Sequence, residues 1–83
     1  MKSILTVYHG PGNVRGSRII ADDGDHNRIT VPYESAVSIA EMHARAALAL
    51  CRKMGWKGRL QGGHVRHGMV WSFIDKHNQI TAK

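Results

Sequence analysis

The sequence predicts an α+β fold in which an antiparallel sheet of about five strands, in the order β-β-β-α-β-β, packs on one amphipathic helix. Three alternating apolar segments precede residue 33, one capped Ala-rich segment follows, and two further alternating segments come after it. The 83 residues suffice for one domain with one modest core. We expect this domain to span residues 1–76 and to be followed by a polar C-terminal tail at residues 77–83.

Three strands are predicted in the first half of the chain, at residues 3–8, 17–21 and 28–31. A Gly-rich loop separates the first two, and the acidic turn at residues 22–27 separates the second from the third. Pro32 ends the third strand because its nitrogen carries no proton to donate to a neighbouring strand. The short connections predict an antiparallel meander.

The helix is predicted to run from its cap at Ser38 to Met54. Ser38 and Glu41 have the spacing of a capping box, and Gly55 follows the last turn as a left-handed cap. A start one turn earlier, at Glu34 or Ser35, is the alternative. One face of this helix is apolar and is expected to pack on the sheet; it comprises Ile39, Met42, Ala46, Ala49, Leu50 and Met54.

A closing hairpin is predicted from strands at residues 59–65 and 69–74, with its turn at residues 66–68. Gly62 and Gly63 mark a bulge or a close backbone approach in the first of these strands. A single helix covers one face of such a sheet. The sequence therefore leaves open a monomer with a strongly curved sheet and a homodimer, formed through an edge strand or through the face of the last strand that carries Met69, Trp71 and Phe73.

The charge of the chain is strongly positive, at +6, and no Asp or Glu occurs between Met42 and Ile74. Such a field attracts nucleic acid, nucleotides or an acidic protein. Cys51 is the single cysteine, which fits the reducing cytoplasm. The first apolar run is too short for a signal peptide, and no run is long enough to span a membrane. We therefore expect a cytoplasmic protein without membrane partners.

The Gly-rich loop at residues 10–18 carries the candidate site. Its glycines and serine expose backbone N–H groups, and its two arginines offer planar donor forks, which suits a phosphate. The alternative is an ordinary hairpin loop with two solvated arginines. Tyr8 and Trp56 are candidates for stacking on bases, whereas Trp71 and Phe73 are expected in the core. The predicted ligand-binding residues are Tyr8, Asn13, Arg15, Gly16, Ser17, Arg18, Trp56, Arg59 and Arg66.

The sequence predicts neither an enzyme nor a bound metal or cofactor. His64 and His67 are separated by a predicted turn, so their side chains need not converge on a metal. The acidic turn lacks the ligand spacing of a calcium loop. The sequence contains no P-loop of the nucleoside-triphosphatase type, no dinucleotide fingerprint and no nucleophile elbow. A non-enzymatic binding module is the remaining interpretation.

The loop pattern Gly10-Pro11-x-Asn13-x-Arg15-Gly16-Ser17-Arg18-Ile19 resembles that of a group of small uncharacterised phage and mobile-element proteins. The resemblance extends to Val31-Pro32-Tyr33, Lys53-Met54-Gly55-Trp56 and Gly62-Gly63. It implies a viral or plasmid accessory protein in the cytoplasm of a bacterial host. We expect such a module to bind nucleic acid or a nucleotide phosphate. The alternatives are a counter-defence inhibitor that binds an acidic host protein and a protein that sequesters a nucleotide messenger.

Overall fold

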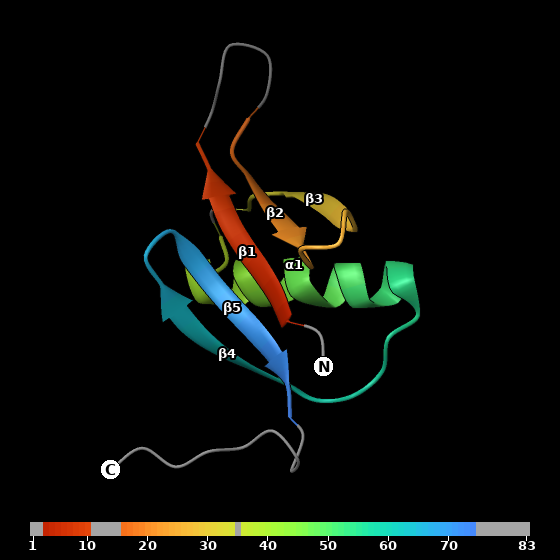
Figure 1. The fold of residues 1–83 in the computed structure, drawn as a ribbon. Helices are drawn as coiled ribbons and strands as arrows, with labels where there is room; N and C mark the ends of the chain where they lie inside the picture. Colours follow the sequence, from red (N-terminus) through yellow and green to blue (C-terminus); the bar gives the residue numbers. More distant parts are fainter. Residues whose placement is uncertain (1–2, 11–15, 35, 75–83) are drawn as a thin grey trace, which may run out of the picture.

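A computed structural model shows a five-stranded antiparallel sheet with one helix on one of its faces (Figure 1). The structure describes residues 3–10, 16–34 and 36–74. The predicted α+β class and the order of its elements are confirmed. The predicted tail at residues 77–83 lies outside the described residues.

The strands follow the sheet order β3-β2-β1-β5-β4, so that the first strand of the chain is the central one. Every neighbouring pair is antiparallel. The pairing of β1 with β5 joins the N-terminal meander to the C-terminal hairpin. The strands are β1 (Ser3–His9), β2 (Arg18–Asp22), β3 (Arg28–Pro32), β4 (Leu60–Val65) and β5 (Gly68–Phe73).

Helix α1 (Ile39–Met54) begins and ends at the predicted caps. The Ser38 hydroxyl oxygen accepts a hydrogen bond from the Glu41 N–H at 3.2 Å. Gly55 adopts the left-handed conformation with φ 76°, which a residue without a Cβ adopts readily. The earlier start is not observed, because the Val37 N–H closes a separate turn on the Glu34 carbonyl.

The core lies between α1 and the sheet, where the helix packs over β1, β2 and β3. The buried helix face is rotated from the predicted one, since Ile39 is 47% exposed whereas His43 and Ala47 are buried. The small side chains of the helix allow close contact with the sheet, and His43 finds a polar partner there. The core comprises Ile4, Ile19, Ala21, Met42, Ala46, Ala47, Leu50 and Cys51.

The β5 face considered above for a homodimer is turned toward the helix side of the sheet. Met69 is buried, and Trp71 and Phe73 pack against the core. The expectation of core packing for the two aromatic rings is thereby confirmed. Trp71 and Phe73 are half-buried, so part of the apolar surface that this face would offer to a second copy is already covered within the monomer. Dimerisation through this face stays a prediction.

The glycine pair in β4 marks a close approach without a bulge. The β4–β5 ladder is continuous over six residue pairs, with Gly62 opposite Trp71. The indole ring lies directly over Gly62, so that a Cβ added there would come within 2.5–2.8 Å of three ring atoms. Gly63 has open space at the corresponding position.

Candidate anion-binding site

Two strand ends hold the arms of the Gly-rich loop. Gly10 follows β1, and Gly16 and Ser17 lead into β2, whose first residue pairs with the last residue of β1. The predicted ligands Asn13 and Arg15 lie outside the described residues. The described part of the candidate site therefore consists of the two loop arms and the side chains around them.

Ser17 is fixed from two sides by tyrosines. The Tyr8 hydroxyl donates to the Ser17 side-chain oxygen at 3.0 Å, and the Tyr33 N–H donates to the Ser17 carbonyl at 3.0 Å. The two tyrosine rings meet edge to face with their centroids 5.3 Å apart, a favoured aromatic geometry. Because the Ser17 oxygen is the acceptor from Tyr8, its own proton can be donated to a ligand.

Arg18 is the strongest indication of a ligand at this loop. One terminal nitrogen of its guanidinium donates weakly to the Gly16 carbonyl at 3.4 Å. Its Nε atom is the one buried side-chain nitrogen or oxygen in the described part of the chain that lacks a hydrogen-bond partner. A shallow depression beside it is lined by Gly16, Ser17, Thr30 and Pro32. The guanidinium of Arg18 lines this depression too. An oxyanion bound there would lie beside it, and a small shift of the side chain would bring the Nε proton, which is closed to solvent, to the missing acceptor.

Further positive charge lies at the same end of the sheet. Arg66 and His67 form the exposed turn between β4 and β5. The first residue of β5, Gly68, pairs with Val7 near the end of β1. This turn and the described arms of the Gly-rich loop, Gly10, Gly16 and Ser17, therefore lie at one end of the sheet (Figure 1). His9, opposite Arg18, belongs to this end as well. The structure therefore places Arg18 and Arg66 at the same sheet end, as the proposed site requires.

Trp56 and Arg59 are located at the other end of the sheet. The Trp56 ring packs edge-on against Phe73, the last residue of β5, and the Arg59 carbonyl accepts the Ile74 N–H at 3.0 Å. A strand of six residues extends over about 20 Å. The structure therefore does not bring these two predicted residues together with the Gly-rich loop.

Three other basic side chains in the described part of the chain are engaged by protein groups. Arg45 donates to Glu41 at 3.0 Å and lies 3.5 Å from Glu34, and Lys53 donates to the carbonyl of Arg28 at 2.9 Å. Arg28 itself donates twice to Asp22. The pKa of Asp22 is lowered by the hydrogen bond from the Gly24 N–H and by that from Arg28. These pairs contrast with Arg18, whose guanidinium keeps an unsatisfied donor.

Thr6, His43 and Trp71 form a buried polar cluster that was not predicted from the sequence. The Thr6 hydroxyl oxygen lies 2.7 Å from His43 Nδ1 and accepts from Trp71 Nε1 at 3.1 Å. Burial lowers the pKa of His43, and the hydrogen bond with Thr6 opposes that shift. Thr6 is 0% and His43 4% exposed, so the cluster stabilises the packing of α1 on the sheet and offers no access to a ligand. Its signal in the sequence is a Thr and a His at inward-facing positions.

Comparisons with protein-family models, curated proteins and solved structures gave no significant match. Within residues 3–10, 16–34 and 36–74, no three His, Cys, Asp or Glu side chains converge as metal ligands. Over the same residues, no helix is long and apolar enough to cross a membrane. The function is therefore inferred from the geometry around Ser17 and Arg18 and from the charge of the chain.

Proposed function

We propose that this chain is a small basic binding module that holds a phosphate of nucleic acid at the Gly-rich loop. The observation that carries the proposal is the buried Arg18 Nε without a partner, next to a depression that Ser17 and Arg18 both line. An arginine fork and a hydroxyl are typical ligands of a phosphate oxygen. The tyrosine pair holds Ser17 in place, so the site is partly organised before a ligand binds.

The charge of the chain supports a polyanionic ligand. A net charge of +6 favours association with a nucleic-acid backbone, whose affinity falls as salt displaces the cationic contacts. Arg66 extends the positive surface at the same end of the sheet. We assign no catalytic step to this surface, and the phosphate is held as part of a binding contact.

The test is fluorescence anisotropy with labelled single- and double-stranded DNA and RNA at about 50 and 200 mM salt, a range over which phosphate contacts weaken steeply. The variant is Arg18→Ala, and Arg52→Ala is the matched control, because it removes the same charge from an exposed position of α1. We expect Arg18→Ala to reduce affinity about tenfold and the salt slope by about 1. Arg52→Ala should change affinity less than about threefold.

Equal effects of the two variants would show that only net charge matters and would contradict the proposed site. Absence of binding at low salt would contradict the nucleic-acid proposal as a whole. A pull-down from nuclease-treated bacterial lysate then distinguishes the alternative, in which an acidic host protein binds the same surface. Excess absorbance at 260 nm after size exclusion would instead indicate a sequestered nucleotide.

A further inference from the structure

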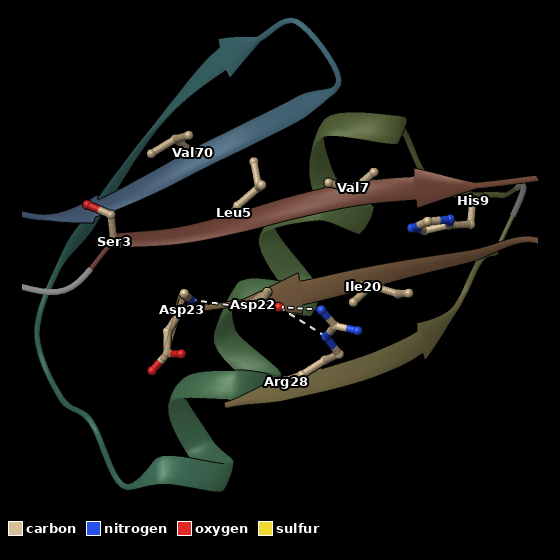
Figure 2. A pocket seen from close by; sticks show the side chains of 10 residues that line it. Ser3, Leu5, Val7, His9, Ile20, Asp22, Asp23, Arg28 and Val70 are labelled. Atoms are coloured by element: carbon tan, nitrogen blue, oxygen red, sulfur yellow. Dashed lines mark hydrogen bonds and ion pairs between the residues drawn. The ribbon is translucent and has the colours of Figure 1, made fainter. Parts of the chain in front are cut away.

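The sheet face opposite α1 has an apolar centre that no described element covers. Leu5 and Val7 of β1, Ile20 of β2 and Val70 of β5 lie side by side on this face (Figure 2). They line a hollow of about 400 Å³, and Leu5 is 41% exposed. In a monomer, these side chains face water.

The border of this apolar patch carries charges of both signs. Asp22 and Arg28 form an ion pair of 2.7 Å beside the hollow (Figure 2), and Ser3, Asp23 and Gly24 line it near them. The patch therefore has little net charge on a chain of +6. This local balance distinguishes it from the positive end of the sheet that carries Arg18.

Charge and composition select among the possible occupants of the patch. The hollow is lined by the imidazole of His9 but by no Phe, Tyr or Trp, so it offers little ring surface on which bases could stack. Its arginine is already bound by Asp22, and the carboxylates at the border disfavour an acidic protein. Because the patch has an apolar centre and little net charge, a second copy of the chain can cover it without bringing like charges together.

We propose that this face is a two-fold interface between two copies of the chain. With the symmetry axis parallel to β1, β5 of one copy lies over β2 of the other. Val70 then lies over Asp22 of the partner copy and next to its Ile20, because Val70 and Asp22 are both in register with Leu5. Leu5, on the central strand, lies close to its own symmetry mate. The helices remain on the outer faces, and the Gly-rich loops stay at the ends of the two sheets.

The size of the face predicts a dimer of moderate stability. Five strands of this length cover roughly 24 by 20 Å, so a face-to-face contact buries roughly 1,000 Å² in total. That area is close to the lower limit for a specific protein interface. We therefore expect dissociation in the micromolar range, where concentration determines the species present.

Sedimentation equilibrium from about 5 to 500 µM, a span chosen to bracket micromolar dissociation, measures the mass directly. The wild type should rise from the monomer mass of 9.2 kDa toward twice that value. Leu5→Asp should remain monomeric, whereas the matched control Leu48→Asp should behave as the wild type. Leu48 is also an exposed leucine, at 52%, but lies on α1. Circular dichroism and thermal unfolding confirm that both variants fold.

Oxidative cross-linking provides a second readout that requires no loss of structure. Leu5→Cys should form a disulfide-linked dimer much faster than Leu48→Cys, because only residue 5 meets its symmetry mate across the proposed axis. The native Cys51 is 5% exposed, and cross-linking of the wild type measures how much disulfide this cysteine forms by itself. A monomeric wild type at all concentrations, a dimer that survives Leu5→Asp, or equal cross-linking of the two cysteine variants would each overturn the proposal. If the wild type is monomeric and captures another protein in pull-downs, and Leu5→Asp abolishes that capture, the face binds that protein instead.

Discussion

The contact between Gly62 and Trp71 gives a stability prediction with an internal control. Gly62→Ala places a methyl group where the indole ring lies, within 2.5–2.8 Å of three ring atoms. The ring must move, and its 3.1 Å hydrogen bond to the Thr6 hydroxyl is then lost or distorted. Overpacking costs about 1–3 kcal/mol, and the lost hydrogen bond adds about 1 kcal/mol.

A gain of about 0.4–1 kcal/mol from reduced freedom of the unfolded chain opposes these costs. We therefore expect Gly62→Ala to lower the free energy of unfolding by about 2–3 kcal/mol. Gly63→Ala is the matched control, because open space surrounds a Cβ there, and it should change stability by less than about 1 kcal/mol.

Urea unfolding followed by circular dichroism measures the change in the free energy of unfolding of both variants. In thermal unfolding of a domain of this size, the melting temperature of Gly62→Ala should fall by roughly 10 °C or more. In a Trp71→Leu background the smaller side chain leaves room for the methyl group, so the cost of Gly62→Ala should shrink. Equal stability of the Gly62 and Gly63 variants would refute the described contact.

Three further predictions follow from the buried and capping groups. Because burial lowers the pKa of His43 from its ordinary 6.5, the unfolded chain binds a proton that the folded chain does not, so stability should fall as pH drops below about 6.5. Urea unfolding between pH 5 and 8 should show a weaker pH dependence in His43→Gln, and an unchanged dependence would argue against the buried neutral histidine. Ser38→Ala removes the hydrogen bond to the Glu41 N–H and should destabilise the fold by about 1 kcal/mol, again by urea unfolding; no loss would mean that the cap contributes little. Burial raises the pKa of the Cys51 thiol, so labelling with a thiol reagent should be roughly 100-fold slower in the native protein than in urea, and similar rates would show that the helix opens easily.

Local signals in the sequence predicted most of the secondary structure. Ser38, Glu41 and Gly55 define the helix ends through contacts within a few residues of each other. The acidic turn and the Gly-rich loop likewise delimit β2 through neighbouring residues. Such interactions are local, so a single sequence reveals them.

The sheet order and the candidate site depended on contacts that no local pattern encodes. The pairing of β1 with β5 brings Thr6 to Trp71, 65 residues away, and this pairing created the buried polar cluster. The same order determined which predicted site residues lie together, since it put Arg66 at the loop end of the sheet and Trp56 at the other. The alternation of β5 showed its two faces and placed Trp71 and Phe73 in the core, as the structure has them, but it did not show that β5 would pair with β1.

The central position of β1 has a consequence for folding kinetics. Ser3 meets Ser72 across 69 residues, so the β1–β5 ladder closes late and at a large entropic cost. Until it closes, β1 exposes an unpaired edge in an otherwise formed meander. The β4–β5 hairpin of a neighbouring chain can pair with that edge in the same way as the hairpin of the same chain. Residues 55–59, which connect α1 to β4, are the hinge of such an exchange. Refolding at high concentration therefore favours domain-swapped species, and slow dilution favours the closed monomer.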